Sequence, residues 1–296
     1  MSEQPDVSID SDLARRLVNA QFPQWSDLPI SPVEPGGWDN RTFRLGRRLS
    51  VRLPSGPWYA LQVEKEQSWL PRLSGPLPLA IPVPVASGTP GEGYPYPWSV
   101  YRWLDGEVAG ESTVENPAEF AVALAQFLRA LHRVDPSGGP APGKHNFFRG
   151  ASPAVYAGET VAAIDKLGGE IPGDAVRRVW DQAVAAPWDG DPVWFHGDVA
   201  AGNLLTRGGK LSAVIDFGCA GVGDPACDIV IAWTFFHGAA RDAFRRTLQV
   251  EDATWARGRG WALWKALIGL ADALEHDSGD AEGLRQVIAQ LVLDDG

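Results

Sequence analysis

The alternation of apolar and polar positions predicts a strand-rich region in the first third of the chain. Residues 42–45 and 49–53 are short alternating runs joined by a Gly-Arg-Arg turn, which is typical of a β-hairpin. Residues 64–73 have apolar side chains at helical spacing, and residues 98–104 begin as a strand and continue as a connector. The prolines of residues 76–97 exclude a helix interior there.

After Gly106 the pattern becomes helical. Asn116, Pro117 and Glu119 provide an N-cap, a proline at the first helical position and a feature close to a capping box. The apolar residues that follow on one helical face are Phe120, Leu124, Phe127, Leu128 and Leu131. Further helices are expected at 154–167, 175–185, 257–275 and 283–293, and short buried strands at 193–195 and 211–215. These elements predict an α+β fold with a small strand-rich lobe, residues 1–101, and a larger, mainly helical lobe, residues 102–296.

Composition narrows the class of protein. The chain has 296 residues, of which 45% are hydrophobic and 21% charged, as in ordinary globular proteins. Its net charge of −11 argues against a nucleic-acid partner, since phosphate backbones are bound by basic patches. The acidic start is unlike a signal peptide, and no apolar run reaches the length of a membrane span, so we expect a cytoplasmic protein with no membrane partner. Cys219 and Cys227 are expected to be reduced and buried.

Candidate chemistry is concentrated in two motifs. His196, Asp198 and Asn203 form the pattern HxDxxxxN, and Asp216 opens a later Asp-Phe-Gly at the end of an apolar strand. Phosphoryl transfer needs a group that orients the attacking hydroxyl and metal ions that neutralise phosphate charge. Mg²⁺ prefers oxygen ligands such as those of Asn and Asp. The two motifs in this order therefore predict a phosphotransferase site.

The chain resembles the aminoglycoside phosphotransferase family, including its macrolide phosphotransferase relatives, from Glu34 onward and most closely over residues 195–233. The resemblance implies the bilobal protein-kinase-like fold. It also implies transfer of the γ-phosphoryl group of ATP or GTP to a hydroxyl of a small molecule such as an aminoglycoside or a macrolide. Antibiotic resistance is the biological role that such an acceptor suggests.

The resemblance assigns roles to the motif residues. Asp198 is expected to be the catalytic base that accepts or orients the hydroxyl, and His196 to brace its loop. Asn203 and Asp216 are expected to hold Mg²⁺. Asp228, in a further family signature, is expected to support the loop.

The expected nucleotide site lies in the first lobe. Gly36 and Gly37 precede the hairpin and are expected to cover the phosphates, although a full GxGxxG motif is absent. Arg52 stands where related enzymes carry a nucleotide-contacting lysine, and Glu66 is its expected partner on the following helix. The connector residues expected beside the purine base are Tyr101, Arg102 and Trp103.

Two departures separate the chain from protein kinases. Gly197 occupies the position of an arginine that usually pairs with a phosphorylated activation loop, and no Ala-Pro-Glu follows Asp-Phe-Gly. A protein substrate is therefore not expected. In the Gly-Asp-Pro sequence that follows, Asp224 fits a family signature and equally a helix N-cap before Pro225.

One apparent motif is rejected. The run Gly138–His145 nearly spells a P-loop, but a histidine replaces the Ser or Thr that binds magnesium, and two prolines remove backbone donors.

Other functions remain open. A metal-dependent phosphoesterase needs several His and Asp ligands, whereas His132, His145, His237 and His276 form no ligand cluster in the sequence. A kinase fold that binds nucleotide without turnover is the third possibility, which the intact motif residues oppose.

The acceptor is the least defined element. Acidic residues that could attract an amino sugar are Asp272, Glu275 and Asp277. Aromatic residues that could instead pack a bulkier ligand such as a macrolide are Trp233, Phe235, Phe236, Trp261 and Trp264. The acidic residues could equally form a solvated helix face, and the aromatic residues could equally belong to the hydrophobic core. A metabolic sugar or amino-alcohol kinase is the alternative.

Overall fold

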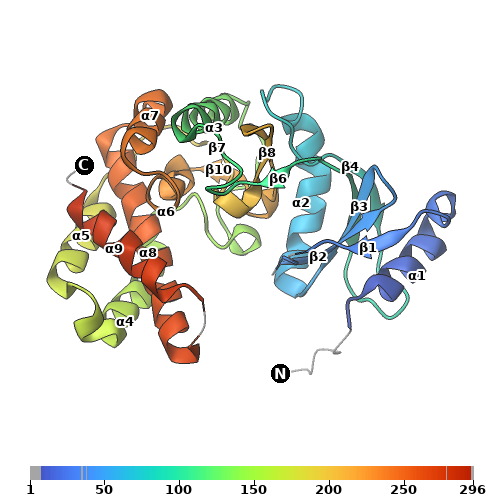
Figure 1. Ribbon diagram of the computed structural model, residues 1–296, viewed down its shortest axis with the longest axis horizontal. Coiled ribbons are helices and arrows are strands. Elements are labelled where there is room, and N and C mark those ends of the chain that lie inside the picture. Colours follow the sequence, from blue (N-terminus) through green and yellow to red (C-terminus); the bar gives the residue numbers. More distant parts are fainter. Residues whose placement is uncertain (1–7, 35, 38, 278, 295–296) are drawn as a thin grey trace. The chain divides into compact units, whose positions relative to one another are not determined.

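The chain forms two compact units in a computed structural model that describes residues 8–294 except Pro35, Trp38 and Ser278 (Figure 1). The first unit comprises Met1–Asp105 with Ala213–Gly218, and the second Gly106–Ser212 with Cys219–Gly296. The α+β class is confirmed, because an antiparallel sheet is followed by a mainly helical region. The functional division into lobes at residue 101 stays a prediction.

The first unit is built on an antiparallel sheet. In the described residues it has the order β1-β2-β3-β5-β4. The strands are β1 (Ile30–Pro32), β2 (Asn40–Leu45), β3 (Leu49–Pro54), β4 (Pro84–Gly88) and β5 (Trp98–Arg102). The predicted hairpin is present as β2 and β3, with Leu45 opposite Leu49. Its turn needs Gly46, whose φ of 58° is in the left-handed region. Strand β4, in the proline-rich segment, was not predicted.

Two helices accompany this sheet. Helix α1 (Ser11–Gln21) was missed by the sequence analysis; its N-cap Asp10 accepts a hydrogen bond from the amide of Leu13 at 2.9 Å. Its buried side chains join those of the strands in one core cluster, which includes Leu13, Ala14, Leu17, Val18, Phe43, Leu45, Val51, Leu53 and Trp98. Helix α2 (Pro57–Leu73) begins earlier than predicted, because the exposed Trp58 and Leu61 obscure the amphipathic pattern of its first turns.

A distant segment completes the first unit. The amide of Val214 donates to the carbonyl of Ala80 at 3.0 Å, which ties residues 213–218 to the segment before β4. The Lys65 ammonium on α2 also donates to the carbonyl of Gly218 at 2.5 Å. These contacts make Asp216 part of the first unit.

The second unit is mainly helical. Its α-helices are α3 (Pro117–His132), α4 (Ala157–Leu167), α5 (Gly173–Ala185), α6 (Ile231–Thr234), α7 (Gly238–Leu248), α8 (Asp252–His276) and α9 (Ala281–Leu293). Its strands are β6 (Glu107–Val108), β7 (Val193–Phe195), β8 (Leu204–Arg207), β9 (Lys210–Val214, whose last two residues belong to the first unit) and β10 (Gly221–Gly223). The 3-10 helices used below are η5 (Ala201–Asn203) and η7 (Pro225–Val230). The helices expected from periodicity are all present, and α6 and α7 are additional.

Local signals explain where α3 begins. The Asn116 side chain accepts hydrogen bonds from the amides of Ala118 and Glu119, as the predicted N-cap requires. The capping box is incomplete in a specific way: Glu119 accepts from the side-chain amide of Asn116 and not from its backbone. In Figure 1 the long helix α8 lies beside α9 within this unit. None of the helices in the described part of the chain has both the length and the apolar character that a membrane crossing requires.

Candidate active site

The predicted catalytic loop begins where strand β7 ends. Asp228 on η7 accepts hydrogen bonds from the backbone amides of His196 at 2.8 Å and Gly197 at 2.6 Å. The His196 side chain is fully buried, and its Nδ1 accepts from the amide of Asp198 at 3.2 Å. Asp228 and His196 thus hold the start of the loop from two sides. In the sequence analysis, His196 was expected to brace this loop and Asp228 to support it.

Asp198 lies at the centre of a polar cluster. Its carboxylate accepts from the Lys265 ammonium at 2.5 Å and from the Asn203 side-chain amide at 3.1 Å. The same Asn203 nitrogen donates to the Asp198 carbonyl at 2.9 Å. Burial alone would raise the pKa of Asp198, but Lys265, followed by His196 and Arg149, holds that pKa below its usual value. Asp198 is therefore ionised at neutral pH and can accept a hydrogen bond from a hydroxyl.

Gly197 is required by the backbone. Its φ is 86°, and a Cβ atom there would lie 2.4 Å from the carbonyl oxygen of Cys219. No L side chain fits this position without moving backbone. The glycine that replaces the protein-kinase arginine therefore reflects a close contact between the loop and the segment after β9.

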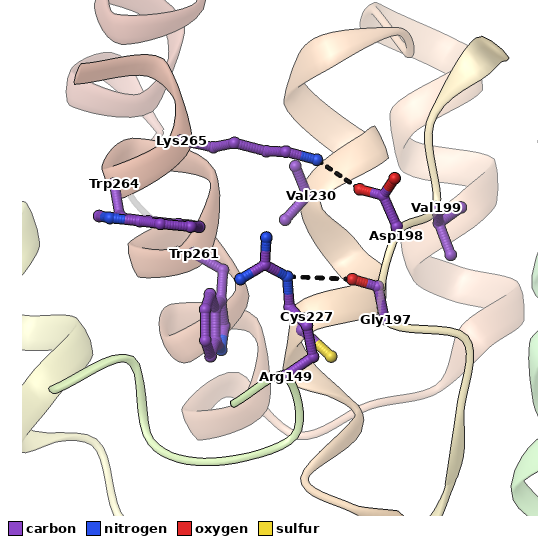
Figure 2. A pocket seen from close by; sticks show the side chains of 9 residues that line it. All are labelled: Arg149, Gly197, Asp198, Val199, Cys227, Val230, Trp261, Trp264 and Lys265. Carbon is purple, nitrogen blue, oxygen red and sulfur yellow. Dashed lines mark hydrogen bonds and ion pairs between the residues drawn. The ribbon is translucent and has the colours of Figure 1, made fainter. Parts of the chain in front are cut away.

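A pocket adjoins Asp198 within the second unit (Figure 2). Its lining residues are Arg149, Gly197, Asp198, Val199, Cys227, Val230, Trp261, Trp264 and Lys265. Figure 2 shows Lys265 reaching from α8 to Asp198, and Arg149 pointing between the two tryptophans and the loop. The pocket combines the candidate base, two cations and two large aromatic faces.

Two buried carboxylates on η7, those of Asp228 and Asp224, lie beneath the catalytic loop. Burial raises the pKa of Asp228 to about 6, against the opposing effects of His196 and the two amides that it accepts. On the same 3-10 helix, Asp224 caps the amide of Ala226 and forms an ion pair with Arg257 of α8 at 2.6 Å. Both carboxylates are almost fully shielded from water. Asp224 is thus an N-cap, one of its two sequence interpretations, and in addition a buried ion-pair partner.

The first unit contains the residues expected to contact nucleotide. Arg52 donates to Asp216 at 2.9 Å and lies 3.5 Å from Glu66, so the expected pairing of Arg52 with Glu66 is present. Glu66 also accepts a hydrogen bond from the Tyr101 hydroxyl. Burial would lower the pKa of Arg52, but Glu66 and then Asp216 raise it above its usual value. Arg52 therefore remains a cation, held between two carboxylates, one of which is a predicted metal ligand.

The remaining nucleotide candidates have mixed support. Gly36 and Gly37 are exposed and adjoin Pro35 and Trp38, which lie outside the described residues. In the connector, the amide of Arg102 donates to Val83 at 3.0 Å and the amide of Trp103 to Arg48 at 2.8 Å. A purine contact through these two amides would compete with existing hydrogen bonds. Nucleotide binding by these residues stays a prediction.

The donor chemistry of Asn203 and Asp216 fits magnesium. The Asn203 amide nitrogen is directed to Asp198, which leaves its oxygen as the ligand atom, and Asp216 offers a carboxylate. Asp216 also has a φ of 65°, a conformation that a non-glycine residue adopts only when its surroundings impose it. Mg²⁺ typically takes one or two protein ligands and completes its shell with water and phosphate. Among the described residues there is no group of three or more His, Cys, Asp or Glu side chains that could hold a metal.

The candidate acceptor residues fall into two groups. The acidic residues lie at the end of α8, where Glu275 pairs with Lys166 at 2.5 Å and Asp272 with His276 at 3.1 Å, and they are not among the residues that line the pocket. Of the aromatic residues, Trp261 and Trp264 line the pocket, whereas Trp233 is a fully buried core residue.

Three basic residues of the site were missed by the sequence analysis. Arg149 lies in a loop with no motif. Lys265 and Arg257 lie within α8, whose run from Trp261 to Leu267 is otherwise apolar. A lysine inside an apolar helical run was the available signal for Lys265, since charged residues are rarely buried without a partner.

Comparison with known proteins confirms the type of enzyme. The sequence matches the phosphotransferase enzyme family (APH) over residues 30–261. The chain belongs to this family. As an APH-family member it is a phosphotransferase, as its motifs predicted. No curated protein matches the sequence at a significant level.

Solved structures share the APH fold at low sequence identity. The GDP complex of aminoglycoside 2'-phosphotransferase-IIIa is 18% identical, covers 96% of this chain and 99% of its own, and has a TM-score of 0.70. A type I macrolide 2'-phosphotransferase is 22% identical, with 96% and 98% coverage and a TM-score of 0.61. The streptomycin–ATP complex of APH(2")-IIa is 18% identical, with 97% coverage of each chain and a TM-score of 0.59. At these identities the likeness establishes the fold, and the acceptor of this APH protein needs its own argument.

Proposed function

We propose that this protein transfers the γ-phosphoryl group of ATP or GTP to a hydroxyl of a small molecule bound in the pocket beside Asp198. The observation that carries the proposal is the position of Asp198, which lines that pocket while Asn203 and Lys265 fix its carboxylate. A hydroxyl placed there would donate its hydrogen bond to Asp198 and direct its oxygen toward the incoming phosphorus.

The reaction follows from this placement. The acceptor oxygen forms a bond to the γ-phosphorus as the bond to the bridging oxygen breaks, which leaves a nucleoside diphosphate. The hydroxyl proton passes to Asp198 and then to solvent. Because the pKa of Asp198 is lowered, its main contribution is to orient the hydroxyl and to receive the proton late in a loose transition state.

The donor side rests on Arg52, Glu66 and Asp216. We propose that Arg52 contacts the nucleotide phosphates while Glu66 holds it in place. Asn203 and Asp216 would hold Mg²⁺, which supplies charge neutralisation on the phosphates when bound. The named relatives were solved with GDP and with ATP, which supports either nucleotide as donor.

Aminoglycosides and macrolides are the first acceptors to consider, since the names of the structural neighbours give those two classes. Trp261 and Trp264 supply a surface for the body of such a molecule. A resistance role would follow from an antibiotic acceptor. A metabolic sugar or amino-alcohol acceptor is the second candidate, because the pocket holds groups able to bind any polar hydroxyl compound.

The test is a coupled assay of nucleoside-diphosphate release with magnesium, with ATP and GTP each tried against aminoglycosides, macrolides and simple sugars. We expect release that depends on an acceptor, and at least about a thousandfold loss of kcat in Asp198→Asn with unchanged nucleotide affinity. Asp165→Asn, an exposed carboxylate on α4, is the matched control. Full activity of Asp198→Asn would contradict the proposed role. Phosphate release without an acceptor would indicate an esterase, and binding without turnover an inactive fold.

A further inference from the structure

Arg149 is a buried cation that forms no ion pair in the described part of the chain, although its charge lowers the pKa of Asp198 and the Tyr156 hydroxyl is a hydrogen-bonding neighbour. The Arg149 side chain is 9% exposed, and its Nε donates to the carbonyl oxygen of Gly197 at 3.1 Å. Its Nη1 is shielded from solvent and makes no hydrogen bond. In the described residues no carboxylate lies within ion-pair distance of the guanidinium. Buried charges are normally paired, and a buried donor left without an acceptor is energetically unfavourable. Arg149 therefore has unused capacity to bind an anion.

The surroundings keep this cation in place. The guanidinium lies over the rings of Trp261 at 5.1 Å and Trp264 at 4.8 Å from the ring centroids. Tyr156 stacks on Trp264 at 4.1 Å, and Glu159 accepts from the Trp264 indole nitrogen at 3.1 Å. These contacts fix the aromatic walls, and Figure 2 shows the guanidinium between them and the loop. Arg149 is thus presented to the pocket by a rigid support.

A second cation faces the same pocket. Lys265 is 40% exposed and uses one of its three ammonium donors on Asp198. The charged residues lining the pocket are therefore two cations and one carboxylate, which leaves an excess of one positive charge. Glu159 accepts a hydrogen bond from the Trp264 indole at 3.1 Å behind the aromatic wall and is not among the residues that line the pocket. Such a pocket attracts an oxyanion and disfavours a polycation.

From this arrangement we propose that the natural acceptor carries an oxyanion group, a carboxylate or a phosphate, which binds to Arg149 and Lys265 while its hydroxyl lies at Asp198. The inference rests on the proposed function and defines the substrate class of the same site. Arg149 provides the planar, directional donors and Lys265 a mobile point charge, which together suit a bidentate anion. On this basis an anionic hydroxy compound is a better acceptor than an aminoglycoside.

Matched sugars test the inference, because glucose, glucuronate and glucosamine share one ring and differ in charge. Binding is measured by calorimetry in the presence of saturating nucleoside diphosphate, which keeps the carboxylate out of the phosphate site. Gluconate against sorbitol and glucose 6-phosphate against glucose repeat the comparison. We expect at least about tenfold tighter binding of each anion than of its neutral counterpart, and the weakest binding for glucosamine.

Variants locate the effect. Lys265→Met should reduce the preference for the anion, and Arg149→Met should abolish it. Lys166→Met, an exposed lysine outside the pocket, is the control and should keep the preference. Because Arg149→Met replaces a buried side chain, the thermal unfolding and the nucleotide affinity of this variant are measured in parallel. If Arg149→Met does not fold, the result for Lys265→Met decides the test.

The outcomes separate the two proposals. If no anion binds more tightly than its neutral counterpart, or if Lys265→Met keeps the preference, the inference is wrong. If Arg149→Met lowers kcat equally for all acceptors and leaves their binding unchanged, the arginine serves the transferred phosphoryl group and the inference is again wrong. Phosphorylation of a neutral or cationic acceptor in preference to its anion would overturn it while the phosphotransferase function stands. Anion binding that depends on Lys265, with no transfer under any condition, would support the inference and contradict the proposed function.

Discussion

Substitution of Asp224 by Asn should strongly destabilise the second unit. Asp224 and Arg257 form a bidentate pair, with distances of 2.6 and 3.1 Å, and the two side chains are 0% and 2% exposed. Arg257 also donates to the carbonyl of Pro187. Asparagine keeps the volume of aspartate and is an equally good N-cap for η7, so the substitution removes little besides the negative charge.

The magnitude follows from the burial. Breaking a buried ion pair by removing one partner costs about 3–5 kcal/mol, because the other charge stays in a low-dielectric site uncompensated. An exposed ion pair contributes only about 0–1 kcal/mol, so Asp165→Asn, which breaks the surface pair with Arg177, is the matched control.

Urea unfolding followed by tryptophan fluorescence and circular dichroism measures the effect, with the free energy of unfolding obtained by linear extrapolation. The double variant Asp224→Leu/Arg257→Met replaces the pair by apolar groups and should be more stable than Asp224→Asn. A loss below about 1 kcal/mol in Asp224→Asn would refute the reasoning, since it would mean that water or another group compensates Arg257.

Two further predictions concern the loop and the pH dependence of stability. Gly197→Ala should lower the free energy of unfolding by about 2–4 kcal/mol and also reduce kcat, because the new Cβ meets the carbonyl of Cys219. Gly202→Ala, where the added Cβ meets nothing within 4 Å, is the control; equal losses would contradict the steric argument. Burial, followed by the charge of Arg129, lowers the pKa of His132 to about 4, so the stability present above pH 6.5 should be lost as the pH falls toward 4. At pH 5 the contribution of His132 that is lost is about 2 kcal/mol. The raised pKa of Asp228 acts in the opposite direction over this range, so urea midpoints at pH 7.5 and 5 are compared between the wild type, His132→Phe and His276→Gln. The loss due to His132 should be absent in His132→Phe alone, and an unchanged pH dependence in that variant would exclude His132 as a source.

The sequence predicted elements and residues whose signals are local. Asp198 and Asn203 lie within one loop, so their spacing alone indicated a joint role. Strands β2 and β3 were visible as alternating runs about a glycine turn. The helix start at Asn116 was visible because the cap residues are contiguous.

Residues brought together by packing were not predictable in this way. Arg149 and Lys265 lie 116 positions apart, in a loop and in α8, and meet only at the pocket. Arg257 was hidden within a predicted helix, where a charged residue ordinarily faces solvent. Helix α1 was missed because its apolar face is short, and the contacts that bury this face are made with the strands of the sheet and not within the helix.

The membership of residues 213–218 in the first unit has a consequence for recombination between relatives. An exchange of the N-terminal region at a single crossover near residue 105 would transfer Arg52 and Ala80 but leave Asp216 and Val214 behind. The chimera would then have to recreate, from two different parents, the ion pair of Arg52 and the hydrogen bond that ties this segment to Ala80. Sequence changes around Arg52 and around Asp216 are therefore expected to be inherited together, although more than 150 positions separate them.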